Sequence, residues 1–249
     1  MNLSVTKIST YLDCPRKFWY RYELYLKTPK SEGLYFGSAV HQGLENYYSG
    51  KDPIQGVKDA LFGEKPHVGE EPKEGIDLVK LEKEAKRIFQ IYPSQAPYFD
   101  PLFVEHRFEV PLIHPETQEK LPAVFKGKID LITREGAVVD HKTASGSPNG
   151  FFEAKNTFQA NGYAYAYYQM FERLPERFVF NFLIKGNTRR EPRIEYKSLK
   201  PTLGDICLFF DTCKQSLDAI IRKETRDCPN KWHCRFCNFK GICSYSKRR

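Results

Sequence analysis

Two short apolar segments joined by a four-residue turn constrain the fold of this chain more than any other feature. Residues 127–132 read Gly-Lys-Ile-Asp-Leu-Ile, residues 133–136 read Thr-Arg-Glu-Gly, and residues 137–142 read Ala-Val-Val-Asp-His-Lys. Apolar runs on either side of a glycine-containing turn predict an antiparallel β-hairpin. With the turn centred on Glu135, opposite residues have a constant sum of numbers, so Asp130 faces Asp140 and Lys128 faces Lys142. Side chains two positions apart share a face of the sheet, and all four therefore project together.

Two carboxylates that face each other across a hairpin need compensation. Opposite residues of an antiparallel pair have Cβ atoms about 5 Å apart, and like charges at that separation repel. A divalent cation provides the compensation, and oxygen ligands in this arrangement suit Mg²⁺ or Mn²⁺. Lys142 could then orient or deprotonate an attacking water and stabilise negative charge in a phosphoryl transition state.

The hairpin alone is also compatible with a surface ladder of two acids and two bases. His141 falls on the apolar face with Ile129, Leu131 and Val139, so we expect its side chain to pack in the core. The backbone carbonyl of His141, however, points sideways between the two site residues and could still ligate a metal ion.

The rest of the chain alternates helical and strand-like patterns, which predicts one α/β domain over residues 1–249. Apolar residues recur at helical spacing over residues 7–26, 40–50, 78–92, 156–174 and 203–222. Short strand-like runs occur at residues 103–112, 124–132, 137–143, 178–184 and 193–196. Pro15 suits an early turn of the first helix, and Pro93 is expected to stop the third. The segment 63–75 is rich in Gly, Pro and Glu and is predicted to be a loop.

Composition restricts the cellular setting and the partner. The 249 residues carry a net charge of +8, which makes a polyanionic partner plausible, although such charge can also be a solvated face. No apolar run has the length of a membrane span, and residues 1–18 lack the apolar stretch of a secretory signal. We therefore expect a cytoplasmic protein with no membrane partner. In a reducing compartment the seven cysteines favour metal or reactive chemistry over disulfides.

Several motifs occur together in this chain, and together they resemble the PD-(D/E)xK nuclease superfamily. Gly127 to Asp130 with Asp140-His141-Lys142 is similar to its active-site hairpin. Gly37-Ser38-Ala39-Val40-His41 is similar to its G-x-x-x-H helix, and Gln159-Ala160-Asn161-Gly162-Tyr163 to the Q-x-x-x-Y motif of RecB-like members. Cys14 with Cys234, Cys237 and Cys243 resembles the cysteine set of the iron-sulfur members, of the CRISPR-adaptation and AddB type.

The resemblance implies a fold, a metal site and roles for these residues. The implied fold is restriction-endonuclease-like, with a central mixed β-sheet flanked by helices. His41, Asp130, Asp140 and the His141 carbonyl would bind Mg²⁺ or Mn²⁺, Lys142 would serve the attacking water, and Gln159 with Tyr163 would line the cleft. Without the resemblance, His41 could be a packed core histidine, and Gln159 and Tyr163 could serve only helix packing. Glu45, one turn after His41, could orient its ring or be solvated. Glu105 could be an accessory acid, but we expect it on a solvated edge.

The cysteines allow two metal centres. The resemblance implies that Cys14, Cys234, Cys237 and Cys243 hold a [4Fe-4S] cluster, which would join residues 1–30 to residues 225–249 as a helical cap. The spacing Cys228-x5-Cys234-x2-Cys237-x5-Cys243 also fits a tetrahedral zinc site, which we consider the weaker alternative. Phosphodiester hydrolysis needs no electron transfer, so the cluster would act as a structural staple.

The sequence thus predicts a metal-dependent DNA nuclease. Aromatic and basic residues are interleaved over residues 16–22, which favours single-stranded DNA or DNA with free ends, cut by an exonuclease or flap nuclease. It could act in recombination, repair or CRISPR adaptation, alone or with a helicase or an integration complex. The alternative is a non-catalytic nucleic-acid-binding protein with a structural zinc site.

Overall fold

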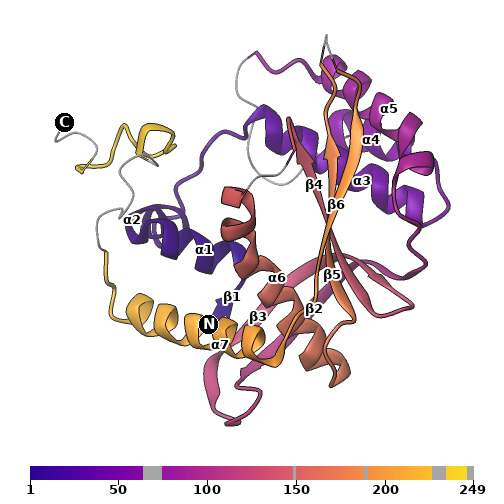
Figure 1. Ribbon diagram of the computed structural model, residues 1–249. Helices are drawn as coiled ribbons and strands as arrows, with labels where there is room; N and C mark the ends of the chain where they lie inside the picture. Colours follow the sequence, from indigo (N-terminus) through magenta and orange to yellow (C-terminus); the bar gives the residue numbers. More distant parts are fainter. Residues whose placement is uncertain (64–74, 148–149, 188–189, 226–233, 246–249) are drawn as a thin grey trace. The chain divides into compact units, whose positions relative to one another are not determined.

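The computed structural model describes residues 1–63, 75–147, 150–187, 190–225 and 234–245, without the side chains of residues 150–156 (Figure 1). The described chain divides into two compact units. Unit 1 contains residues 1–28, 109–127 and 203–249, and unit 2 contains residues 29–108 and 128–202. Cys228 and the predicted loop at 63–75, apart from its two ends, lie outside the described residues.

Unit 2 holds the hairpin and most of the regular structure. Its helices are α3 (Glu32–Tyr48), α4 (Pro53–Phe62), α5 (Leu78–Gln95) and α6 (Gly150–Phe171). Its strands are β4 (Ala137–Ala144), β5 (Arg177–Ile184) and β6 (Arg193–Leu199), with parts of β2 (Pro101–Ile113) and β3 (Lys120–Thr133), which both continue into unit 1.

The strands form a mixed sheet in the order β1-β3-β4-β5-β6, with β2 also paired to β3. β3 and β4 are antiparallel, β4 and β5 are parallel, and β5 and β6 are antiparallel. A parallel neighbour cannot be reached by a tight turn, and α6 is the crossover that connects β4 to β5.

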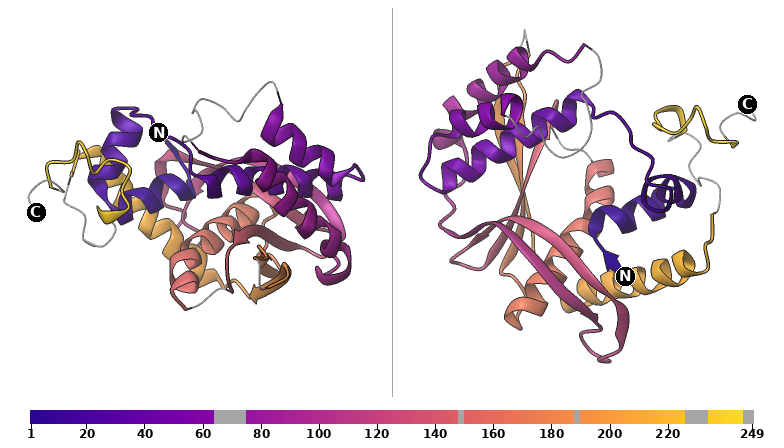
Figure 2. Two further views of the ribbon diagram at one scale, coloured as in Figure 1. Left: turned by 90° about the horizontal axis from the view of Figure 1, so that it is seen from above. Right: turned by 180° about the vertical axis from the view of Figure 1, so that it is seen from behind.

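Helices cover both faces of β4, β5 and β6. α3, α4 and α5 lie together on one face, and α6 lies on the other (Figures 1 and 2). The alternation of β5 side chains explains this arrangement. Leu183 packs into the core of α3, α4 and α5, whereas Phe178 lies 6.4 Å from the ring of Tyr163 on α6. The predicted α/β fold, with a mixed sheet flanked by helices, is confirmed.

Close helix contacts fix the position of α3, the helix that carries His41. A Cβ atom at Gly43 would lie 2.5 Å from the Phe89 ring on α5. A Cβ atom at Gly56 on α4 would lie 2.6 Å from the backbone oxygen of Gln42. Both glycines therefore allow neighbouring helices to approach α3 more closely than a side chain would permit.

Unit 1 contains both ends of the described chain. Its elements are β1 (Asn2–Leu3), α1 (Val5–Asp13), α2 (Pro15–Phe18), a π-helical turn (Trp19–Glu23) and α7 (Leu203–Ile221). Tyr11, Phe18 and Ile220 form a small core, and Phe125 packs 4.9 Å from Phe209, measured between ring centroids.

Both helix predictions that rest on a proline differ from the structure. The helix predicted over residues 7–26 is interrupted at Cys14, whose backbone is extended (φ −166°, ψ 105°). Proline disfavours helical backbone at the preceding residue, so Pro15 ends one helix and begins the next. Pro93 does not stop α5, which continues to Gln95, and the Ala96 amide donates to the Tyr92 carbonyl in the last turn.

Candidate active site

The β3–β4 hairpin has the predicted register. Leu131 pairs with Val139 and Ile132 with Val138, which gives the sum of residue numbers expected from a turn centred on Glu135. Gly136 has a positive φ of 86° and donates its amide to the Thr133 carbonyl, which closes the turn. The backbone amide of His141 donates to Oδ2 of Asp130 (2.7 Å). The Asp130 carboxylate thus accepts a hydrogen bond from the backbone of the neighbouring strand, next to Asp140 and Lys142.

Asp130 and His41 form an ion pair. Oδ1 of Asp130 lies 3.5 Å from Nδ1 of His41, and the Asp130 side chain is only 9% exposed. Burial alone would raise the pKa of Asp130, but the charge and hydrogen bond of His41 and the hydrogen bond from the His141 backbone amide hold it well below its usual range. Burial alone would lower the pKa of His41, but the charge and hydrogen bond of Asp130 raise it above 6.5. Asp130 is therefore a carboxylate at neutral pH.

Glu105 completes a group of three potential metal ligands. Its Oε1 atom lies 3.8 Å from Nδ1 of His41, and one ligand atom each of His41, Glu105 and Asp130 lie within 4.8 Å of one another. The expectation of a solvated edge is wrong, because the Glu105 side chain is 10% exposed. Its positive φ of 52°, unusual in a strand, explains why alternation along β2 did not place it correctly.

Asp140 is bound by a lysine and a glutamine. Lys142 Nζ lies 2.7 Å from Asp140 Oδ2 and donates to Gln159 Oε1 (2.8 Å), and Gln159 Nε2 donates to Asp140 Oδ1 (2.9 Å). Burial raises the pKa of Asp140 to about 6, with Lys142 opposing the shift and the charge of Asp130 adding to it. The three side chains form a closed triangle in which α6 holds the lysine of β4.

Tyr163 lies one turn after Gln159 and completes the site on α6. Burial raises the pKa of Tyr163, the charges of Asp140 and Asp130 add to the shift, and a hydrogen bond from Gln159 opposes it. Its ring also packs 6.2 Å from Phe108 and 6.4 Å from Phe178. Tyr163 therefore contacts both the polar site and the apolar core.

His141 is buried, as predicted, but within a polar chain rather than a purely apolar core. Asn181 Nδ2 lies 3.0 Å from His141 Nδ1 and donates to the Tyr92 hydroxyl (2.9 Å), which lies 2.8 Å from the Tyr48 hydroxyl. The Tyr48 ring stacks on His141 at 5.8 Å. Burial lowers the pKa of His141 to about 4, so this imidazole is neutral. Sequence reasoning missed Asn181, although an amide inside the apolar run 178–184 was the available signal.

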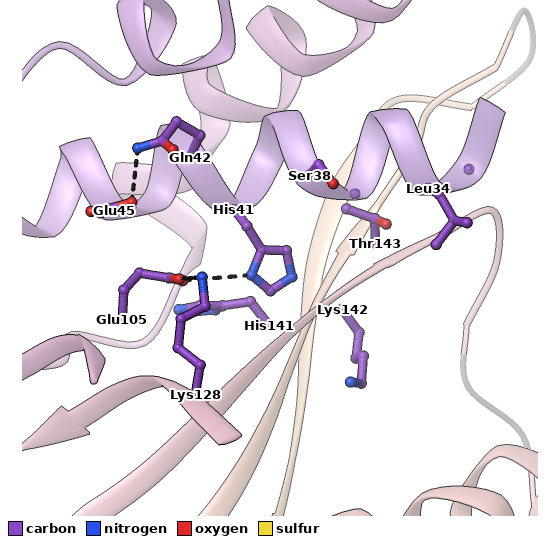
Figure 3. A pocket seen from close by; sticks show the side chains of 12 residues that line it. Leu34, Ser38, His41, Gln42, Glu45, Glu105, Lys128, His141, Lys142 and Thr143 are labelled. Carbon is purple, nitrogen blue, oxygen red and sulfur yellow. Dashed lines mark hydrogen bonds and ion pairs between the residues drawn. The ribbon is translucent and has the colours of Figure 1, made fainter. Parts of the chain in front are cut away.

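A pocket of about 440 Å³ lies beside these groups, lined by residues of α3, β2, β3 and β4. Figure 3 shows His41, Glu105 and Lys128 directed toward one another, with Lys142 on the adjacent strand. Glu45 also lines the pocket, and Gln42 donates to its carboxylate at 2.8 Å. Glu45 thus accepts a hydrogen bond from Gln42, while His41 pairs with Glu105 and Asp130.

The donor set fits a divalent metal ion. The group combines an imidazole nitrogen with two carboxylates that are mostly removed from water, and hard divalent cations prefer such oxygen ligands. Within the described residues the structure brings together His41, Asp130 and Glu105, whereas the predicted ligand Asp140 lies outside this group of three and contacts Lys142 and Gln159.

The candidate cluster ligands Cys14, Cys234, Cys237 and Cys243 all belong to unit 1 and are half-buried. Cys14 caps α2, with its sulfur accepting from the Lys17 amide (3.4 Å). Two contacts join its surroundings to the C-terminal segment: Arg16 donates to Ser244 (3.1 Å), and the rings of Tyr20 and Phe239 lie 5.3 Å apart. The fold of unit 1 therefore brings the two cysteine-bearing segments together.

Comparison with known proteins identifies the family. The family model of the PD-(D/E)XK nuclease superfamily matches residues 2–244, so the chain belongs to this superfamily. No curated protein matches the chain in sequence. Within the described residues, none of the helices is long and apolar enough to cross a membrane.

One solved structure has a similar fold. The chain is similar to the crystal structure of a protein from Eubacterium rectale named provisionally as an exonuclease, with a TM-score of 0.60 and 14% identity, covering 100% of this chain and 88% of that one. At this identity the likeness concerns the fold alone. The chain also matches the crystal structure of SSO0001 at a TM-score of 0.47 and 13% identity, covering 98% and 86%.

Proposed function

We propose that this protein is a metal-dependent DNA nuclease that hydrolyses phosphodiester bonds. The observation that carries the proposal is the hairpin that presents Asp130, Asp140 and Lys142 beside His41 and Glu105. Superfamily membership supports a nucleic acid substrate and a divalent metal. A non-catalytic binding protein would not need a buried acid whose pKa is raised to about 6 next to a lysine held by two partners.

The chain's own side chains account for most of the required chemistry. His41, Glu105, Asp130 and Asp140, with the His141 carbonyl, would hold Mg²⁺ or Mn²⁺. When bound, such an ion polarises a phosphate oxygen and lowers the pKa of water. Lys142 has three N–H donors, and its contacts with Asp140 and Gln159 use two of them, which leaves one for a water molecule or a phosphate oxygen. Gln159 and Tyr163 keep the lysine in place.

We infer that single-stranded DNA with a free end is the preferred substrate. In unit 1, aromatic and basic side chains alternate around the π-helical turn, and Arg21 lies over the ring of Tyr22 at 5.6 Å. Tyr25 follows with 80% of its surface exposed. An exposed aromatic ring such as Tyr25 would stack an unpaired base, and neighbouring positive charges would attract phosphates without reading sequence.

The test of the proposed function is cleavage of end-labelled single-stranded DNA with Mg²⁺ or Mn²⁺. We expect linear DNA to be degraded and Asp130→Asn to be inactive, because the substitution removes a buried charge from the metal-binding group. Asp100→Asn, a change at a half-exposed aspartate elsewhere in unit 2, is the matched control and should cleave like the wild type. Equal persistence of the DNA with wild type and Asp130→Asn, also after addition of a partner helicase or integrase, would exclude a nuclease. Covalently closed circular DNA distinguishes exonuclease from endonuclease action.

We further propose that Cys14, Cys234, Cys237 and Cys243 hold a [4Fe-4S] cluster that joins the two ends of unit 1. The contacts of Arg16 with Ser244 and of Tyr20 with Phe239 support this arrangement. Protein purified without oxygen is expected to be brown, and Cys14→Ser is expected to lose colour and iron. Cys213→Ser, at a buried cysteine of α7, should keep both. A colourless wild-type protein that contains stoichiometric zinc would instead establish the zinc alternative.

A further inference from the structure

Two lysines of β3 each form an ion pair with a glutamate of β2. Lys126 Nζ lies 2.7 Å from Glu109, and Lys128 is in contact with Glu105. The pairs differ in their surroundings, because the Glu109 side chain is 58% exposed and the Glu105 side chain is 10% exposed. Water can replace Lys126 as the partner of Glu109, whereas a buried carboxylate such as Glu105 needs a cation beside it.

Besides His41, whose Nδ1 lies 3.8 Å away, Glu105 has two possible cationic partners, which compete. One is the Lys128 ammonium, and the other is the divalent ion that His41, Glu105 and Asp130 would hold. An ammonium in contact with a ligand carboxylate opposes a second cation at the same oxygens, because positive charges at that separation repel. Entry of the ion therefore weakens the hold of Glu105 on Lys128.

A released Lys128 remains beside the site. Its side chain is 43% exposed, and it lines the same pocket as His41 and Lys142 (Figure 3). A lysine stem is flexible, and its ammonium binds phosphate as a point charge. The pocket lined by the candidate metal ligands would then also contain the Lys128 ammonium, which could bind a backbone phosphate of the nucleic acid.

We propose that Lys128 is a substrate-binding residue that Glu105 retains in the metal-free protein and releases to a DNA phosphate when a divalent ion binds. The proposal rests on the proposed function and adds a coupling to it: the ion strengthens DNA binding through Lys128. By reciprocity, DNA strengthens ion binding by the same factor.

The first test measures ion binding without DNA, by electron paramagnetic resonance of unbound Mn²⁺. Lys128→Met removes the competing ammonium and is expected to bind Mn²⁺ about two- to fivefold more tightly than wild type, as for loss of one partly exposed ion pair. Lys126→Met removes the same charge two residues away and should leave Mn²⁺ binding unchanged. Lys128→Arg retains the charge and should bind Mn²⁺ like the wild type.

The second test measures binding of a labelled single-stranded oligonucleotide as a function of salt, in EDTA and in Ca²⁺, with the DNA checked to be intact afterwards. In Ca²⁺ we expect Lys128→Met to bind more weakly and its logarithmic salt slope to be smaller by about 0.7, the contribution of one phosphate contact. In EDTA its slope should equal that of the wild type, because Glu105 retains Lys128 there. Lys126→Met should change the slope equally, or not at all, in both conditions.

Unchanged Mn²⁺ affinity of Lys128→Met, or an equal loss of salt slope in EDTA and Ca²⁺, overturns the Lys128 proposal while the nuclease remains. A wild-type protein that binds neither Mn²⁺ nor DNA overturns both proposals, so the two failures can be distinguished.

Discussion

Lys142→Ala is expected to lower the rate of DNA cleavage about a thousandfold, within the usual range for loss of a positioned acid–base or charge-stabilising group. Lys142 is the only member of the Asp140–Lys142–Gln159 triangle with a positive charge, and its ammonium has no other role in the described contacts of this site. Single-turnover cleavage of end-labelled DNA with saturating Mn²⁺ measures the effect on the chemical step.

Two further measurements give this prediction its specificity. Mn²⁺ binding by Lys142→Ala should be as tight as in the wild type or tighter, because a positive charge beside Asp140 has been removed. Lys86→Ala, which removes a half-buried i,i+4 ion pair with Glu82 on α5, is the matched control and should cleave normally. A Lys142→Ala protein that is folded and cleaves within tenfold of the wild type would contradict the assigned role.

Asp140→Asn is expected to stabilise the metal-free protein at pH 8 by about 1–3 kcal/mol while removing its activity. The folded-state pKa of Asp140 is raised to about 6 from 3.8, so the folded protein favours the neutral acid. The stability that the acid contributes is present in full below pH 3.8 and is lost as the pH rises through about 6. An asparagine is neutral at every pH and avoids this loss.

Urea unfolding in EDTA at pH 8 and pH 5 measures the difference between wild type and Asp140→Asn. The gain should be larger at pH 8 than at pH 5, and Asp100→Asn, at a half-exposed aspartate, is the matched control. Added Mn²⁺ should stabilise the wild type more than the variant, since a ligand stabilises the state that binds it. A variant that is less stable than the wild type at both pH values in EDTA would show that the Lys142 ion pair outweighs burial.

The hairpin could be predicted because its geometry follows from local rules. A turn centred on Glu135 fixes the register of β3 against β4, and a period of two then assigns every side chain to a face. The approach of α6 to the hairpin was available only through a resemblance. No short-range sequence pattern predicts that the Gln159 side chain of the crossover helix α6 lies 2.8 Å from the Lys142 ammonium.

Glu105 and Cys14 show where local rules fail. Alternating charges around Glu105 are typical of a solvated edge strand. No sequence pattern predicts the positive φ that Glu105 adopts where its side chain is buried. Pro15 lies in a first helical turn, as its sequence predicts, but that turn begins α2 and does not belong to α1. In both cases the backbone departs from its regular form at the position of a candidate ligand.

The His41–Asp130 pair also sets a condition for loading the protein with metal. An imidazole coordinates an ion only after losing its proton, and the neighbouring carboxylate makes that proton harder to remove than in free histidine. Uptake of an ion at this site would therefore release the proton of His41. Acidification would empty the site before it protonated the carboxylate of Asp130. The pH of the surroundings would therefore set the fraction of the protein that carries the metal ion.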